Sequence, residues 1–305
     1  MRVTSNMSAD NSIYNLQQGR TKLDKINELI ATQANVNRPS DDPISTRLLL
    51  DVSDKVKAGD QYLSNIQKAT TWQQMTDTAL AGLSDTLELA RKQVGTITSG
   101  STDPTIRAGV VAQLTLLKQQ MIDMGNTQMG DQYIFGGAKN TTPPFTNVVS
   151  PPALATDYYT GDETALNIEI GSNTTQQMNI TGNQVLTGAG TAPYGTTNIL
   201  KAFDDLIAAV NANDVPGIQA GAGLLDDGAN QITNSRTAVA SRTLRLDTMT
   251  KLNTNTKNTL EIIYGNAQNV DNIKLAVELN QQNIAFEASL SSTAKVSQLS
   301  LLDYM

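Results

Sequence analysis

The sequence predicts a mainly α protein: an elongated antiparallel helical bundle or coiled coil formed by both chain ends, with a small outer β-rich insert. Three observations favour this class. Apolar residues on both flanks recur at alternating spacings of three and four, which places them on one helix face. Residues 140–200 contain no Lys or Arg and are rich in Thr, Asn, Gly and Pro. Aromatic residues make up only 4% of the chain, so aliphatic side chains must fill the core, as in thin helical bundles.

An amphipathic helix is expected near the start of the chain. Leu16, Leu23, Ile26 and Ile30 lie on one helix face, where Gly19 fills the gap in the stripe. The residues that follow Thr32, Gln-Ala-Asn, include no glycine to end the helix in a left-handed turn. The sequence therefore favours a first helix that runs on toward Val36.

Further apolar stripes predict a helical hairpin. One stripe spans residues 80–97, and another spans residues 110–124. The turn between them contains Asp103, which can accept hydrogen bonds from the first N–H groups of a helix, and Pro104, which suits the first helical position. Two neighbouring stripes joined by a short turn predict antiparallel helices.

Residues 139–195 are expected to form the β-rich insert, with long loops. Ile168 and Ile170 alternate with polar residues, as do Met178 and Ile180, and this alternation is the period of a strand.

The most regular helical pattern runs from Ile218 to Val270, after which its phase slips. Such a slip changes the local supercoil. Because Gly265 and Asn266 lie just before it, we expect a domain junction there. The predicted domains are a discontinuous terminal-helix coiled coil of residues 1–42 and 266–305, a discontinuous helical bundle of residues 43–138 and 196–265, and the outer domain of residues 139–195.

The chemistry missing from the sequence excludes several functional classes. There is no His and no Cys, which removes the usual triads, thiol nucleophiles and zinc ligands, and there is no glycine-rich phosphate-binding motif. We therefore expect no enzyme, and no catalytic, cofactor or metal site. The net charge of −7 without a basic patch makes nucleic acid an unsuitable partner. No stretch approaches the roughly 18 apolar residues that span a bilayer, and the N-terminus lacks the apolar region of a cleaved signal peptide.

The two chain ends carry apolar residues that need a partner. Termini are ordinarily polar and frayed, and a pair of helices has too little mutual contact to hide so much apolar surface. An intramolecular coiled coil explains the central stripes, but it leaves the C-terminal leucines uncovered. We therefore expect the ends to be buried between stacked copies, because a head-to-tail contact that does not close forms a helical assembly. The expected interface residues are Leu16, Leu23, Ile26, Ile30, Val277, Ile284, Leu290, Leu299, Leu301 and Leu302.

One short motif is the most specific signal in the chain. It consists of Asn37, Arg38, Pro39, Ser40, Asp41, Asp42 and Pro43. Ser40, Asp41 or Asp42 can cap a helix that begins at Pro43, and both prolines bias their predecessors away from helix. The local expectation is a stiff, capped turn between two helices.

With this motif the chain resembles the bacterial flagellin superfamily, and within it the hook–filament junction proteins. The opening MRVTSNM, the segment YIFGGAKNTTPPF at residues 133–145, residues 158–188 and the C-terminal ASLSSTAKVSQLSLLDYM resemble the same superfamily, so the likeness covers nearly the whole chain. The Gln-Ala-Asn segment after Thr32 departs from the Gly-Lys pair common in that position.

The resemblance implies a structural adaptor of the bacterial flagellum. Copies would form a ring between the hook-side junction protein, hook-associated protein 1, and the flagellin filament. The chain would reach the cell exterior by flagellar type III export without a cleaved signal, and a cytosolic export chaperone would bind its C-terminal helix. No cofactor is implied.

Two alternatives stay open on the sequence. A flagellin filament subunit would form long homopolymers, whereas a junction subunit would form none or only short ones. An adhesin-like protein would bind its ligand through the β-rich insert, so deletion of residues 139–195 would abolish ligand binding and spare assembly.

Overall fold

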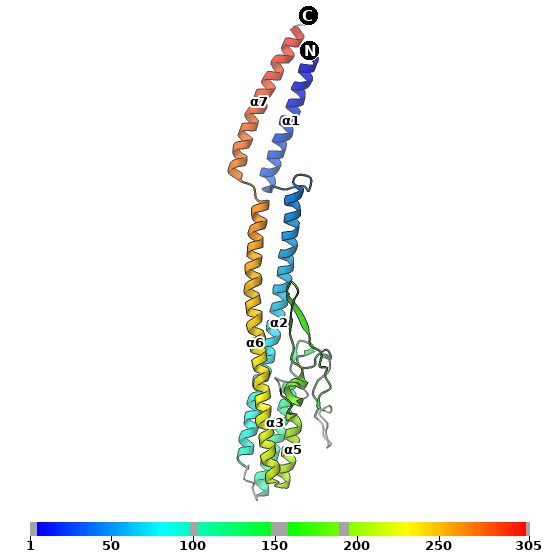
Figure 1. Ribbon diagram of the computed structural model, residues 1–305, viewed down its shortest axis with the longest axis vertical. Helices are drawn as coiled ribbons and strands as arrows, with labels where there is room; N and C mark the ends of the chain where they lie inside the picture. The colour runs from blue at the N-terminus through cyan, green and yellow to red at the C-terminus, as the bar shows by residue number, and fades with distance from the viewer. Residues whose placement is uncertain (1–4, 98–102, 148–157, 189–194, 303–305) are drawn as a thin grey trace. The chain divides into compact units, whose positions relative to one another are not determined.

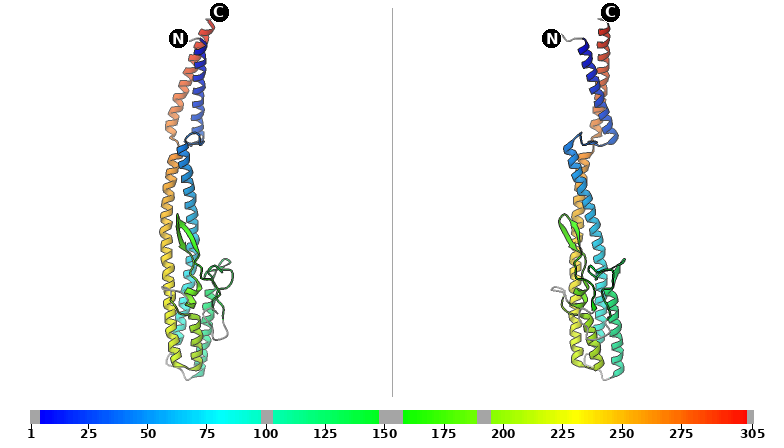
Figure 2. Two further views of the ribbon diagram at one scale, coloured as in Figure 1. Left: turned by 45° about the vertical axis from the view of Figure 1, so that its right-hand side comes forward. Right: turned by 90° about the vertical axis from the view of Figure 1, so that its right-hand side faces the viewer.

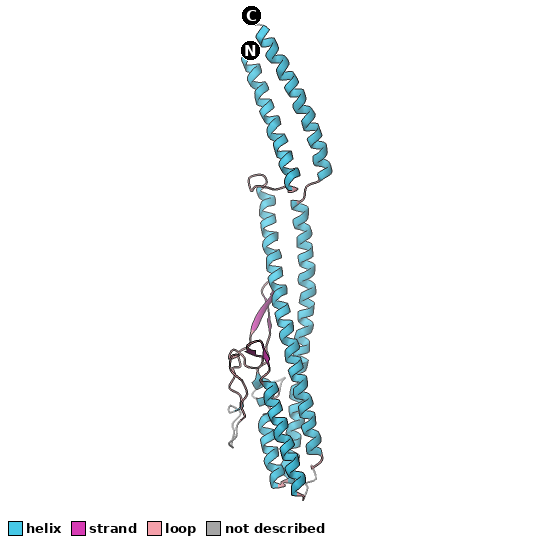
Figure 3. Cartoon of the chain, turned by 180° about the vertical axis from the view of Figure 1, so that it is seen from behind, coloured by secondary structure: helices cyan, strands magenta, loops and turns pink. Residues whose placement is uncertain are grey.

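The structure of the protein, a computed structural model, describes residues 5–97, 103–147, 158–188 and 195–302. The chain divides into two compact units, which we call the terminal unit (residues 1–58 and 256–305) and the central unit (residues 59–255). The helices are α1 (Ser5–Thr32), α2 (Pro43–Gly95), α3 (Pro104–Gly125), α5 (Ile199–Ala212), α6 (Val215–Gln268) and α7 (Asn272–Leu302). The predicted fold class, helical with a small β part, is confirmed (Figures 1 and 3).

The terminal unit is built on the antiparallel pair of α1 and α7, which lie side by side in every view (Figures 1 and 2). The first part of α2 and the last part of α6 belong to the same unit.

The central unit contains a helical bundle. The rest of α2 and α6 packs with α3 and α5 around a continuous apolar core. Aliphatic residues supply most of the core, as the composition requires. Its fully buried members include Leu80, Leu83, Leu87, Leu114, Leu206, Leu225 and Ile232. The helix start predicted at Asp103 is confirmed: the Asp103 carboxylate accepts a hydrogen bond from Thr105 N at 2.8 Å, and Pro104 begins α3. Residues 98–102 of the predicted turn lie outside the described residues.

Two small antiparallel hairpins make up the β structure of the described residues. The first, β1 (Gln128–Met129) with β2 (Gln132–Tyr133), directly follows α3. The second, β3 (Asn167–Gly171) with β4 (Thr174–Gln177), contains an irregularity between Glu169 and Gly171 (Figure 3, magenta). A short π-helix covers Asn183–Thr187.

The β3–β4 hairpin lies along α2 and α6. Ile170 packs in a small core with Ile66 and Ala69 of α2 and Leu246 of α6. Side-chain amides of both helices also bind the hairpin backbone: Asn65 Nδ2 donates to Glu169 O, and Asn253 Nδ2 donates to Ile170 O, each at 2.9 Å. The hairpin therefore joins the two helices along one face.

Two local predictions were wrong. The strand predicted at Met178 and Ile180 does not form, because β4 ends at Gln177; after it only Met178 N makes one further backbone bond, to Leu166 O. The first helix does not run on toward Val36. It ends at Thr32 because Gln33 adopts the left-handed conformation, with φ of 53°, that glycine usually supplies.

Gly137, just before the insert, is a position that requires glycine, because the backbone of Asp162 lies close to it. Gly137 has φ of +65°, and a Cβ built there would lie 2.0 Å from Asp162 O. We expect Gly137→Ala to lower the free energy of unfolding by about 2–4 kcal/mol, from left-handed strain and displacement of the Asp162 backbone. Gly130→Ala is the matched control, because Gly130 has φ of +62° with no atom within 4 Å of the added Cβ. This variant should lose only about 1 kcal/mol, and equal losses in urea unfolding would contradict the prediction.

Candidate assembly interface

The α1 residues predicted for the interface line the inner side of the terminal helix pair. Leu16, Leu23, Ile26 and Ile30 are all half-buried. Gly19 lies on the same helix face, and a Cβ built on it would come within 3.2 Å of the Phe286 ring on α7. The gap in the predicted stripe is therefore the place where Phe286 packs.

The inner side of α7 was not singled out from the sequence. Leu275 is 7% exposed, and Leu279 and Phe286 are half-buried, at spacings of four and seven residues. Between them, Gln282 Nε2 donates a hydrogen bond to Gly19 O at 3.3 Å. The helical spacing of Leu275, Leu279 and Phe286 is visible in the sequence. The stripe at Val277 and Ile284 is equally regular, so the spacing alone does not tell which stripe faces α1.

That second stripe lies on the opposite side of α7. Ile273 is 81% exposed, Val277 52% and Ile284 61%. We call these three residues the outer stripe. Each of them lies about half a helical turn from the inner residues Leu275, Leu279 and Phe286. A shallow groove runs beside them, between Asn272 and Gln281. Helix α7 is therefore apolar on two opposite faces, and α1 covers only one of them.

The remaining predicted interface residues lie near the C-terminus. Leu290 is 47% exposed. Leu299, Leu301 and Leu302 lie in the last turns of α7, outside the residues whose side chains the structure describes.

Asp42 caps α2. Its Oδ1 accepts hydrogen bonds from Ile44 N at 3.0 Å and Ser45 N at 3.1 Å, and its Oδ2 accepts from the Ser45 hydroxyl at 2.6 Å. These bonds satisfy N–H groups that have no partner within the helix. They also favour the ionised carboxylate, and so the Ser45 hydroxyl and N–H lower the pKa of Asp42 below its ordinary value.

The other charged residues of the motif bind α1. Lys25 Nζ lies 3.0 Å from Asp41 Oδ1, and this hydrogen bond lowers the pKa of Asp41. Arg38 Nη2 lies 3.2 Å from Glu28 Oε1. The motif is thus a turn held at both ends, by a cap on α2 and by two ion pairs to α1. Pro39 and Ser40 lie in the turn between these contacts, Asn37 lies in a bend just before it, and Pro43 begins α2.

The chain crosses between helices twice in the terminal unit, and the two connections touch. Asn35 N donates to Gln268 O at 2.6 Å, and Ala34 forms an isolated antiparallel bridge with Asn269. Asp271 caps α7 as Asp42 caps α2, because its Oδ1 accepts from Ile273 N and Lys274 N at 3.0 and 3.1 Å.

Two further kinds of feature are absent from the described residues. None of their helices is both long and apolar enough to pass through a bilayer. Within the same residues, acidic side chains do not gather into a group of three that could hold a metal ion.

The chain is similar to structural proteins of the bacterial flagellum. Residues 3–140 match the family described as the bacterial flagellin N-terminal helical region. Across 319 aligned residues the chain is 23% identical to flagellar hook-associated protein 3 of Salmonella typhimurium, covering 99% of this chain and 98% of that protein. The protein of the same name from Escherichia coli is 23% identical over 264 residues, covering 83% and 80%.

Solved structures share the fold. A putative flagellar hook-associated protein from Vibrio parahaemolyticus superimposes with a TM-score of 0.65 at 23% identity, covering 75% of this chain and all of that one. A flagellar junction protein from Legionella pneumophila superimposes with a TM-score of 0.57 at 14% identity, covering 72% and 99%. The resemblance predicted from the sequence is thus confirmed, and it is to hook-associated protein 3 of the flagellin superfamily.

Proposed function

We propose that this chain is a non-enzymatic adaptor of the bacterial flagellum, which joins hook-associated protein 1 to the flagellin filament through stacking of its terminal helices. The relatives named as hook-associated and junction proteins support the role. The resemblance also supports a site outside the cell, reached by type III export without a cleaved signal, and a chaperone on the C-terminal helix.

The stacking mechanism rests on one observation: helix α7 carries apolar residues on two opposite sides. The inner stripe is covered by α1, whereas the outer stripe leaves three large aliphatic side chains half or more exposed. Burying each of them against a neighbouring copy would contribute roughly 1.5–3 kcal/mol. In this assignment Leu16, Leu23, Ile26 and Ile30 hold the pair together, and Val277 and Ile284 face the next copy.

The assignment of the predicted domains remains part of the proposal. The inner tube is taken as residues 1–42 and 266–305, the next layer as residues 43–138 and 196–265, and the outer layer as residues 139–195. The adhesin-like alternative is less favoured, because the described part of the insert contains a single two-stranded hairpin and so offers little surface for a ligand.

The stacking mechanism can be tested by placing charged side chains on the outer stripe. We expect Val277→Glu with Ile284→Glu to leave the helical content and the α1–α7 pair unchanged, because both side chains already face solvent. Stacking should be lost, since it would bury two unpaired carboxylates. In the bacterium that makes this chain, the variant should be exported, yet filaments should detach and hooks remain bare in electron micrographs.

The control is Asn283→Glu with Ala285→Glu, two exposed positions of the same helix outside the outer stripe. It adds the same charge and should retain filament attachment. Attached filaments in the outer-stripe variant would refute the proposed stacking. Long filaments grown from the purified, unaltered chain alone would favour the flagellin alternative instead.

A further inference from the structure

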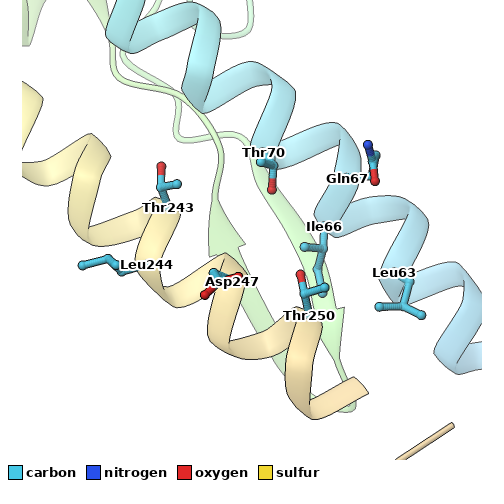
Figure 4. A pocket seen from close by; sticks show the side chains of 8 residues that line it. All are labelled: Leu63, Ile66, Gln67, Thr70, Thr243, Leu244, Asp247 and Thr250. Atoms are coloured by element: carbon cyan, nitrogen blue, oxygen red, sulfur yellow. The ribbon is translucent and has the colours of Figure 1, made fainter. Parts of the chain in front are cut away.

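A groove runs between α2 and α6 in the central unit. Leu63 and Ile66 border one end, Asp77 and Arg236 border the other, and Thr243 and Leu244 lie in its middle. Figure 4 shows the first part of the groove, with lining side chains from α2 on one side and from α6 on the other. Leu244 is 70% exposed although it is a large aliphatic residue.

Threonines give this groove an unusual polarity. Five of them donate their only hydroxyl hydrogen to a carbonyl of their own helix, at 2.8–3.0 Å: Thr78, Thr233, Thr237, Thr243 and Thr250. What they offer to an occupant is therefore a methyl group and acceptor lone pairs. The groove is thus rich in acceptors.

The charges of the groove are already paired. Arg236 Nε lies 3.1 Å from Asp77 Oδ1 and joins the two helices. Lys251 Nζ lies 2.8 Å from Asp247 Oδ2. An occupant therefore needs hydrogen-bond donors and apolar surface, but no net charge.

The exposed face of α3 has these properties. From Ala108 to Ile122 the only charged residue is Lys118, and Lys118 is buried against Asp204. The face carries Leu116, 71% exposed, with the exposed amides of Gln113 and Gln120, whose N–H groups are donors. Gly109 has open space around it, which allows a second helix to approach closely.

The two surfaces also match in length. At 1.5 Å per residue, the groove spans about 24 Å of α2 and the uncharged face spans about 22 Å of α3. Both surfaces belong to the central unit, whereas the outer stripe of α7 belongs to the terminal unit.

We propose that the α2–α6 groove binds the exposed face of α3 from a second copy of this chain. Because groove and helix face are different surfaces, the contact is head-to-tail, and a bound pair keeps one free groove on one copy and one free α3 face on the other. Successive copies can therefore add in one direction around a ring or along a helix. Leu116 of one copy would pack beside Leu244 of the next.

Disulfide trapping tests this contact in the full-length chain, which has no cysteine of its own. Chains carrying Leu116→Cys and chains carrying Leu244→Cys are mixed at high concentration and oxidised with copper phenanthroline. Because a disulfide requires Cα atoms within about 7 Å, we expect about tenfold more dimer from the mixture than from either chain alone. Both positions are exposed, so neither substitution disturbs the core.

Leu252→Cys is the matched control, since Leu252 is 56% exposed on α6 but does not line the groove. Its mixture with the Leu116→Cys chain should give no more dimer than random collision. Three outcomes would overturn the proposal: equal amounts of dimer with Leu252→Cys and with Leu244→Cys, mainly self-paired dimers of either chain, or no disulfide-linked dimer at all. Since the outer-stripe residues are unaltered in these chains, failure here would leave the proposed terminal stacking untouched.

Discussion

Removal of residues 290–305 is expected to leave the central unit fully folded and to abolish attachment of the filament. The central unit is formed by residues 59–255, so its core loses no contact. The truncation removes Leu290, Leu299, Leu301 and Leu302, each worth roughly 1.5–3 kcal/mol when buried against a neighbour. Leu275, Leu279 and Phe286 remain to hold the first half of α7 against α1.

Electron microscopy of cells that make the truncated chain would show bare hooks and free filaments. A failure of export must be separated from a failure of joining, because the chaperone proposal places its partner on the same helix. Purified chain added from outside to cells with bare hooks bypasses export. Attachment restored by the truncated chain in this assay would contradict the terminal mechanism. A full-length control with Ser291→Ala and Ser292→Ala keeps the leucines and should restore attachment.

Asp204→Asn is expected to give the largest loss of stability among conservative substitutions in the bundle. Lys118 Nζ lies 2.7 and 2.8 Å from the two carboxylate oxygens of Asp204, the Tyr158 hydroxyl donates to the same carboxylate, and Lys118 also lies 5.3 Å from the centre of the Tyr158 ring. The Lys118 side chain is only 6% exposed. Removal of the carboxylate leaves its ammonium buried without a counter-charge, which costs about 3 kcal/mol.

The adjacent residue provides the control. Asp205 pairs with Lys201 on the solvent side, where both side chains are about half exposed, and Asp205→Asn should cost less than about 0.5 kcal/mol. Urea unfolding followed by the fluorescence of Trp72, the only tryptophan and 1% exposed, measures both losses. The double variant Lys118→Met with Asp204→Leu should recover most of the lost stability. Similar losses for Asp204→Asn and Asp205→Asn would show that the Lys118–Asp204 ion pair stabilises the fold no more than an exposed pair does.

Periodicity was sufficient to predict the helices, because the spacing of leucines and isoleucines reports directly on a helix face. The start of α3 could be predicted because Asp103 and Pro104 are residues that favour a helix N-terminus. Strands were harder to place. The alternation at Met178 and Ile180 resembles that at Ile168 and Ile170, but only Ile168 and Ile170 lie in a strand, β3. The position of β3 depends on contacts with residues of α2 and α6 that are more than 80 residues away in the chain.

The candidate interface could be predicted only in part from the sequence. Two apolar stripes on α7 cannot be ranked by periodicity alone, since either could face α1. The packing of Phe286 against Gly19 decides the question, and that contact joins opposite ends of the chain. The end of the first helix was also hard to predict, because Gln33 adopts a left-handed conformation that residues other than glycine rarely adopt. The bridge between Ala34 and Asn269 helps to maintain this conformation.

That tie between the two connections has a mechanical consequence. Torque travels along a helix through its ladder of backbone bonds, and here both ladders stop, one at Thr32 and the other at Gln268. The backbone bond from Asn35 to Gln268 fastens the two short crossings to each other. A rotation of either crossing would therefore act on its neighbour through this bond, so that the two crossings are mechanically coupled.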